Sequence, residues 1–281
     1  MSVLVTGATG KVGRRVVERL ERRGIQVRAA SRSSATPLDW WHPAGWADAL
    51  ENVDRAFVVV PGGDDGHRSV RGLGHQVIKF LDVAEAADVG AVVLMTAMGM
   101  EYAPAEVEQR AVELHLQSGG MHWTILRPNW FHQNLTEGIL ADLAAANNGV
   151  LATPTGEAAV GFIDAADIAE VAAEVIAGAA TDEHHGREYT LTGPKAHTFA
   201  EVAALSAATG GPLTGYHPAS DEDFRERTAG LGWAEEYIDT LSGLFSIIAS
   251  GAAARVTGDV LDILQRCPSD IEEFFNTINR Q

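Results

Sequence analysis

The first two thirds of the chain alternate short apolar runs with amphipathic helical patterns. Runs rich in β-branched residues predict buried strands, and apolar positions at spacings of three and four predict helices that cover them. The predicted strands are residues 3–5, 25–30, 38–40, 56–60, 91–95, 122–126 and 189–191. The predicted helices are residues 11–23, 75–87, 106–117 and 164–177. This alternation is typical of a doubly wound α/β fold, in which helices cover both faces of a parallel sheet.

The pattern changes after about residue 193. Four helical patterns follow without strong strands between them: residues 199–209, 221–228, 233–250 and 271–279. We interpret this part as a smaller, mainly helical C-terminal lobe, to which residues 130–155 also belong. The larger domain then comprises residues 1–129 and is completed by about 156–192, while the lobe comprises 130–155 and 193–281.

Composition describes an ordinary globular protein. The 281 residues are 46% hydrophobic and 21% charged, with a mean hydropathy of −0.01, so the chain can bury a large core. The single cysteine, Cys267, excludes an intramolecular disulfide and a cysteine-based zinc site, and we predict no metal. Met1 leads directly into an apolar strand, and no apolar run approaches the roughly 20 residues of a membrane span. We therefore expect a cytoplasmic protein without membrane attachment.

The net charge of −17 gives an acidic surface that repels phosphate backbones, so nucleic acid is not an expected partner. Basic residues nevertheless cluster once, at Lys11, Arg14, Arg15, Arg19, Arg22, Arg23, Arg28 and Arg32. Such a cluster suits a DNA backbone or a small phosphate-bearing ligand. Its position beside a glycine-rich turn favours the small ligand.

That turn carries three glycines, Gly7, Gly10 and Gly13, between the first strand and the first helix. In a dinucleotide-binding turn the first glycine allows the tight turn, the second lets backbone approach a pyrophosphate, and the third permits close helix packing. N–H groups of the helix N-terminus then face the phosphates. The alternative is a structural turn that happens to be glycine-rich. We predict a Rossmann-type dinucleotide-binding domain whose loop contacts are Gly7, Thr9, Gly10, Lys11, Val12 and Gly13.

The second strand ends in Ala30-Ser31-Arg32-Ser33-Ser34, without an acidic residue. An NAD-preferring site places Asp or Glu there to bind the ribose hydroxyls. Arg32 can instead pair with a 2′-phosphate, and Ser31 and Ser33 can donate hydrogen bonds to it. The segment favours NADP(H) over NAD(H), with Ser31 and Arg32 as candidate contacts. The alternative is that Arg32 is a solvated surface charge.

Several motifs together resemble the NmrA-like group of atypical short-chain dehydrogenase/reductases, which includes type-2 quinone oxidoreductases and many bacterial NAD(P)H-binding proteins. The motifs are residues 6–13, 123–134, 162–169, 189–194 and 267–275. The resemblance covers nearly the whole chain. Its glycine motif is shared by a whole superfamily, whereas the segment from Arg127 to Asn134 is more specific.

The resemblance implies where further ligand contacts lie. Asp39 and Trp40 would lie by the adenine, Val60 and Pro61 along the cofactor groove, Thr96 and Ala97 near the nicotinamide ribose, and Arg127, Pro128 and Asn129 beside the nicotinamide. Met98, Asn129, Trp130, Phe131 and Asn134 would bind substrate. For Trp130 and Phe131 the alternative is core packing between the lobes. Asp164 and Asp167 are expected to cap the following helix.

The helix after the fifth strand lacks the Tyr-x-x-x-Lys pair of standard short-chain reductases, whose lysine lowers the tyrosine pKa for proton exchange. Arg110 is the candidate for the lysine position, with Glu106 at the tyrosine position. Tyr102, His115 and His132 are candidate substitute acids. The catalytic residues are therefore not identified from the sequence.

Two functions follow. The first is an NADPH-dependent reductase that transfers hydride to a quinone, enone or similar conjugated carbonyl; an aromatic set in the lobe suits such a flat substrate. That set is Trp130, Phe131, Phe224, Trp233, Tyr237 and Phe245. The second is a non-enzymatic NADP(H)-binding redox sensor that acts through a protein partner. A homodimer is compatible with either function.

Overall fold

In the computed structural model, which describes residues 1–61, 71–178 and 181–278, seven strands form one parallel sheet. The strand order is β3-β2-β1-β4-β5-β6-β9. The strands are β1 (Ser2–Thr6), β2 (Gln26–Ser31), β3 (Thr36–Pro37), β4 (Arg55–Val59), β5 (Ala91–Met95), β6 (His122–Pro128) and β9 (Arg187–Leu191). The order reverses between β1 and β4: β1 lies between β2 and β4, and its Val3 is paired with Val27 of β2 on one side and with Arg55 of β4 on the other. Open α/β sheets bind ligands at such a reversal, outside the carboxyl ends of the strands.

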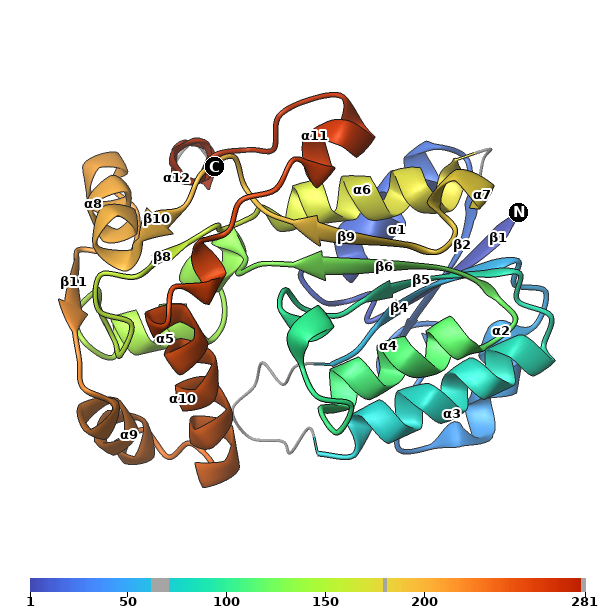
Figure 1. Cartoon of the computed structure of the whole chain (residues 1–281), viewed down its shortest axis with the longest axis horizontal. Helices are drawn as coiled ribbons and strands as arrows, with labels where there is room; N and C mark the ends of the chain where they lie inside the picture. Colours follow the sequence, from blue (N-terminus) through green and yellow to red (C-terminus); the bar gives the residue numbers. More distant parts are fainter. Residues whose placement is uncertain (62–70, 179–180, 279–281) are drawn as a thin grey trace.

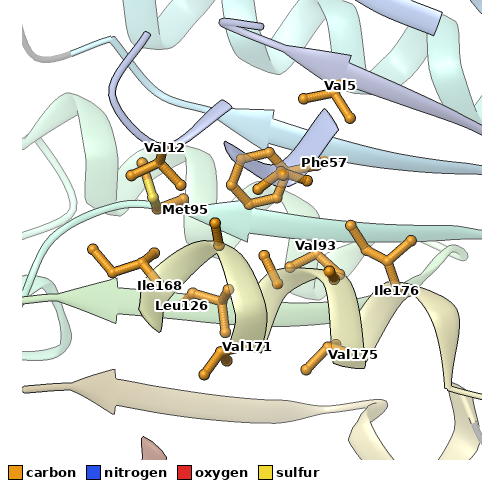
Figure 2. Close-up of a cluster of buried hydrophobic side chains, with 14 of the residues drawn as sticks. Val5, Val12, Phe57, Val93, Met95, Leu126, Ile168, Val171, Val175 and Ile176 are labelled. Carbon is orange, nitrogen blue, oxygen red and sulfur yellow. The ribbon is translucent and has the colours of Figure 1, made fainter. Parts of the chain in front are cut away.

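Helices cover both faces of the sheet (Figure 1). One face carries α1 (Gly13–Arg22) and α6 (Ala165–Ala177), and the other carries α2 (Trp46–Leu50), α3 (Leu73–Ala86) and α4 (Glu108–Ser118). Figure 2 shows Ile168, Val171 and Val175 of α6 beside strand residues Val93 and Leu126. Three fully buried alanines, Ala169, Ala172 and Ala173, let α6 pack closely against its neighbours. The two faces form separate hydrophobic clusters.

The remaining elements gather beyond the carboxyl ends of the strands, on the left of Figure 1. They include α5 (Ile139–Ala145), α8 (Phe199–Thr209), α9 (Asp221–Gly230), α10 (Glu235–Ala249) and α12 (Ile271–Ile278). These helices share a third hydrophobic cluster rich in phenylalanine. Two small sheets join them: β7 (Val150–Thr153) runs parallel to β11 (Gly215–Pro218), and β8 (Ala159–Val160) runs antiparallel to β10 (His197–Thr198).

Short elements complete the chain. They are the 3₁₀ turns η1 (Pro43–Gly45), η2 (Met100–Tyr102), η3 (His132–Leu135) and η4 (Ala252–Ala254), and the helices α7 (Thr181–His184) and α11 (Asp259–Leu264). Within the described ranges no single helix is long and apolar enough to cross a membrane, although the bent pair Glu235–Ala249 and Ala252–Leu264 would meet that requirement by length and composition.

The structure confirms the Rossmann-type fold and most of the predicted elements, and it differs from the prediction in several details. The third strand was predicted at residues 38–40 but lies at Thr36–Pro37, because Leu38 turns into the core while its N–H still bonds to Ser31. The helix predicted from Glu106 begins at Glu108. The four-residue strands β7 and β11 were not predicted, since each is stabilised by a partner distant in sequence. Asn279, the last residue of the helix predicted at 271–279, and the glycines Gly62 and Gly63, at which a turn is expected after the strand 56–60, lie outside the described residues.

Candidate functional site

The glycine turn after β1 is shaped by its three glycines for different reasons. Gly7 has φ of +60°, a left-handed conformation that favours glycine. A Cβ on Gly13 would lie 2.2 Å from the carbonyl oxygen of Gly7, so the start of α1 can approach the turn only without a side chain. A side chain at Gly10 would be less crowded than one at Gly13. The Gly10 N–H donates to the same Gly7 carbonyl oxygen at 2.9 Å, and a Cβ on Gly10 would lie 3.2 Å from that oxygen. The geometry fits the predicted roles of Gly7 and Gly13, whereas the pyrophosphate contact of Gly10 stays a prediction.

The start of α1 suits an anionic group. Among the described residues no side chain caps this helix, and its first turn holds no acidic residue. An N-terminus of this kind presents N–H groups and a positive partial charge to anions. Burial, followed by the nearby Arg14 charge, lowers the pKa of Arg15 in this turn.

The segment around η3 crosses over this turn. Lys11 Nζ donates to Asn134 Oδ1 at 3.0 Å, and Arg14 forms an ion pair with Glu137 at 2.8 Å. Asn134, which was predicted to bind substrate, is therefore in contact with the glycine turn. Farther along α1, Arg19 and Arg23 both pair with Glu170 of α6. These pairs neutralise much of the basic cluster that the sequence shows.

The end of β2 lies next to the glycine turn, since Ala8 N donates to Ala30 O at 3.1 Å. Ser31 is buried and its hydroxyl accepts from Ser33 N at 3.3 Å, whereas Arg32 is exposed. Asp39 lies close enough to Arg32 to interact electrostatically. The pKa of Asp39 is lowered mainly by the Trp41 N–H, with smaller contributions from His42 and Arg32. Because Arg32 is exposed at this edge of the sheet, its guanidinium can turn toward a bound phosphate.

Aromatic residues follow β3. Trp40 packs edge-on against Phe80 at 5.4 Å and against Trp46 at 6.3 Å, so its ring belongs largely to the core beneath this edge. Trp41 is instead 51% exposed, which the sequence interpretation overlooked because it assigned the adenine contact to Trp40. Val60 is buried at the end of β4 and Pro61 is half-buried beside it.

Beyond β5 and β6 the chain continues the parallel hydrogen-bonding pattern. Thr96 N donates to Leu126 O and Met98 N donates to Pro128 O, both at 3.0 Å. Asn129 is buried, and its side chain is engaged at both ends: Nδ2 donates to Ala253 O at 2.8 Å and Oδ1 accepts from Trp130 N at 2.9 Å. Ala97 is half-buried next to Thr96. The predicted contacts thus lie at the carboxyl ends of six neighbouring strands, β1 to β6, along one edge of the sheet.

A buried ion-pair cluster lies directly behind that edge. Glu113 of α4 is fully buried, and Arg127 of β6 binds it through two hydrogen bonds of 2.8 Å. Thr96 Oγ1 and Arg110 also donate to this carboxylate, at 2.6 and 2.7 Å. Burial by itself raises the pKa of Glu113, but these hydrogen bonds outweigh it and the pKa is lowered. Burial likewise favours a lower pKa for Arg127, yet its bonds to Glu113 and Glu188 raise it.

The cluster includes one of the two residues assigned to the positions of the missing Tyr-x-x-x-Lys pair. Arg110 is tied to Glu113, and Glu106 is exposed before the helix begins. Glu113 was not recognised as a site residue. The sequence did hold a signal for Glu113: it lies three residues after Arg110, a spacing at which side chains on a helix meet, and next to Val112, which is on the buried face of α4.

The neighbouring Trp130 and Phe131 point into different clusters, because they are consecutive in extended backbone. Trp130 stacks on Phe245 at 5.6 Å, whereas Phe131 packs against the cluster between the sheet and α6. The proposed aromatic lining is wrong for Phe224 and Phe245, which are 1% and 0% exposed and therefore belong to the core.

The candidate proton donors are scattered. Tyr102 on η2 is 79% exposed, and His115 pairs with Asp82 at 2.7 Å on the outer side of α4. His132 is 1% exposed, with its ring 5.3 Å from that of Phe274. Asp164 caps α6 as predicted, since its side chain accepts from Ala166 N at 2.6 Å. The same prediction is wrong for Asp167, which lies inside α6 and instead accepts from Ser269 N and pairs with Arg266, both at 2.7 Å.

Comparison with known proteins places the chain in a family. Residues 7–179 match the NAD(P)H-binding family model. An uncharacterised oxidoreductase, YesF of Bacillus subtilis, is 30% identical over 97% of this chain and 93% of its own length. The NAD(P)H azoreductase of Xenophilus azovorans is 30% identical over 97% of this chain and 96% of its own.

Structural comparison agrees. The crystal structure of the Escherichia coli NADPH-dependent quinone oxidoreductase QOR2 with NADPH superposes with a TM-score of 0.80 and 22% identity, covering 99% of each chain. The match extends through both the sheet and the helices beyond it, so the fold is shared over the whole length. This protein belongs to the NAD(P)H-binding family.

Proposed function

We propose that this protein is an NADPH-dependent oxidoreductase that transfers hydride to a quinone, an enone or a similar conjugated carbonyl. The observation that carries the proposal is the uncapped start of α1 behind the Gly7–Gly13 contact, at the point where the strand order reverses. Full-length similarity to an NAD(P)H azoreductase and to other oxidoreductases supports a reductase.

The residues present fit a dinucleotide. The backbone of the glycine turn and the N-terminus of α1 would hold the pyrophosphate, with Thr9, Lys11 and Val12 beside it. Ser31 and Arg32 would bind a 2′-phosphate, and Asp39, Trp40, Val60 and Pro61 would line the adenosine half. Thr96, Ala97 and Pro128 would flank the nicotinamide, which supplies the hydride when bound.

The substrate would lie on the lobe side of the same edge. Met98, Asn129, Trp130, Phe131 and Asn134 remain the candidate contacts, and the lobe comprises residues 130–155 and 193–281 in this proposal. With Arg110 bound to Glu113 and His132 buried, the substrate oxygen takes its proton from water. This route suits a conjugated carbonyl, whose reduced oxygen is more weakly basic than an alkoxide.

Turnover tests the reductase directly. Purified protein with NADPH is expected to reduce members of a panel of quinones and enones, followed by the loss of nicotinamide absorbance. Tight NADPH binding without turnover on any member would contradict the reductase and would favour the redox sensor. NADPH binding itself is measured separately, by quenching of tryptophan fluorescence.

Replacement of Arg32 by aspartate tests the cofactor preference. We expect the dissociation constant for NADPH to rise about tenfold, because an exposed charge-assisted hydrogen bond contributes about 1.5 kcal/mol. The constant for NADH should change little. Arg22→Asp is the matched control, since Arg22 belongs to the same basic cluster but pairs with Glu18 at the far end of α1. Equal weakening of NADPH and NADH by Arg32→Asp would remove Arg32 from the site.

A further inference from the structure

The carboxylate of Glu113 has its acceptor positions filled. Oε1 accepts from Thr96 Oγ1 at 2.6 Å and from Arg127 Nε at 2.8 Å. Oε2 accepts from Arg127 Nη2 at 2.8 Å and from Arg110 Nη1 at 2.7 Å. A carboxylate offers about four lone-pair positions, and three of these four contacts come from guanidinium N–H groups, which can only donate. The two arginines therefore fix the carboxylate in its ionised form and in one orientation.

This arrangement determines what the Thr96 hydroxyl can do. A threonine hydroxyl has one proton to donate and two lone pairs to accept. The proton lies on the short bond to Glu113, because an ionised carboxylate cannot donate one in return. The oxygen of Thr96 is left as an acceptor toward any further neighbour.

Thr96 is also the member of this cluster that the chain places directly after the carboxyl end of a strand. Arg127 lies within β6 and Arg110 lies within α4, whereas Thr96 follows Met95, the last residue of β5. Thr96 is 6% exposed as a residue, whereas Glu113 is 0% exposed. The sheet edge at this point is the one at which the cofactor is proposed to bind.

We propose that Glu113 is a positioning residue, which orients the Thr96 hydroxyl as a hydrogen-bond acceptor for a donor on the nicotinamide half of the dinucleotide. The donor is either the carboxamide N–H or a ribose O–H. The inference depends on the proposed cofactor site. It also means that Thr96 does not supply the proton to the substrate oxygen, in agreement with a proton taken from water.

A double-mutant cycle on NADPH affinity tests this coupling, with each dissociation constant measured by fluorescence and folding checked by thermal unfolding. Thr96→Val keeps the shape of the side chain without the hydroxyl and is expected to bind NADPH roughly 3–10-fold more weakly. Thr96→Ser should remain within about twofold of the wild type, since it keeps the hydroxyl. Glu113→Gln should weaken NADPH binding about as much as Thr96→Val does. The double variant Thr96→Val with Glu113→Gln should bind NADPH no more weakly than whichever of the two single variants binds it less tightly.

Glu188→Gln is the matched control. Glu188 also pairs with Arg127, at 2.6 Å, but its carboxylate is bound by Arg127 and Gln117 rather than by Thr96. NADPH affinity should therefore stay within about twofold in this variant, even where thermal stability falls. If Glu113→Gln does not fold, Glu113→Asp replaces it in the cycle, because it keeps the charge and withdraws the carboxylate from Thr96.

A cofactor analogue identifies the donor. In the 3-acetylpyridine analogue of NADPH a methyl ketone replaces the carboxamide, so the amide N–H is missing. If Thr96→Val weakens NADPH but not the analogue, the donor is the amide; if it weakens both, the donor is a ribose hydroxyl. NADPH affinity that is unaffected by Thr96→Val, or single effects that multiply in the double variant, would overturn the coupling. A wild-type protein that does not bind NADPH would instead contradict the proposed cofactor site.

Discussion

Replacing Arg127 by methionine is expected to lower the free energy of unfolding by about 3–5 kcal/mol at pH 7, because it leaves a buried carboxylate without its main partner. Arg127 is 2% exposed and Glu113 is 0% exposed, so water cannot replace the lost hydrogen bonds. Unfolding in urea, followed by circular dichroism, measures the change. A loss below about 1 kcal/mol would show that Glu113 is solvated or otherwise compensated.

The same variant carries a pH signature. In the wild type the folded-state pKa of Glu113 is lowered, so its ionised form stabilises the protein above the unfolded pKa and that stability is lost as the pH falls through the folded pKa. Without Arg127, the hydrogen bonds from Thr96 and Arg110 remain but the largest contribution that opposes burial is lost, so we expect the pKa of Glu113 to rise. The difference in free energy of unfolding between the wild type and Arg127→Met should therefore be largest near neutral pH and become smaller as the pH falls toward about 5.

A double variant controls for the loss of packing. Combining Arg127→Met with Glu113→Leu removes the two buried charges, and replacement of a buried pair by apolar residues is often close to neutral. The charges that lose a partner, Arg110 and Glu188, are partly exposed and can be hydrated. We expect the double variant to recover more than half of the lost stability. A double variant as unstable as Arg127→Met alone would assign the effect to packing of the arginine stem instead of to the unpaired charge.

Substitution of Gly13 by alanine is expected to weaken NADPH binding about 100-fold. The new Cβ would lie 2.2 Å from Gly7 O and 2.7 Å from Gly7 C, and both are backbone atoms that cannot rotate away. Relief requires α1 to move away from the turn, which separates the two halves of the proposed pyrophosphate site. Overpacking of this kind costs about 1–3 kcal/mol, and the displaced N–H groups add to the loss. Fluorescence titration with NADPH gives the dissociation constant.

Gly243→Ala is the control for this substitution. Gly243 is exposed within α10, and a Cβ there would meet no atom within 4 Å. The change should leave NADPH affinity unaltered and add about 0.5–1 kcal/mol to stability, since alanine is the better helix former. NADPH affinity within about threefold of the wild type in Gly13→Ala would show that the turn does not hold the cofactor.

Much of the fold follows from local sequence patterns. The strands that form the centre of the sheet are apolar runs with β-branched residues, and the helices between them show a clear apolar face, so their period identified them. The glycines at 7, 10 and 13 were recognisable because a tight turn before a helix tolerates few other residues. The family match over residues 7–179 agrees with that interpretation.

Other parts depended on contacts between residues distant in sequence. Strands β7 and β11 are short and pair with each other across more than sixty residues, so local pattern gave no reason to expect them. Local pattern also gave no reason to expect that the side chains of Trp130 and Phe131 would pack into two different hydrophobic clusters. Phe224 and Phe245 were expected to line the site, but they fill the third hydrophobic cluster.

The sequence by itself therefore determined the sheet, the glycine turn and the absence of a Tyr-x-x-x-Lys pair, because each of these is encoded in adjacent residues. Only the tertiary structure showed that a buried ion-pair cluster lies near the position at which other short-chain reductases have that pair. Glu113, Thr96 and Arg127 come from a helix and the ends of two strands, and they become partners only when α4 packs on the sheet. A buried carboxylate is tolerated only where such donors converge, and that convergence is a property of the fold.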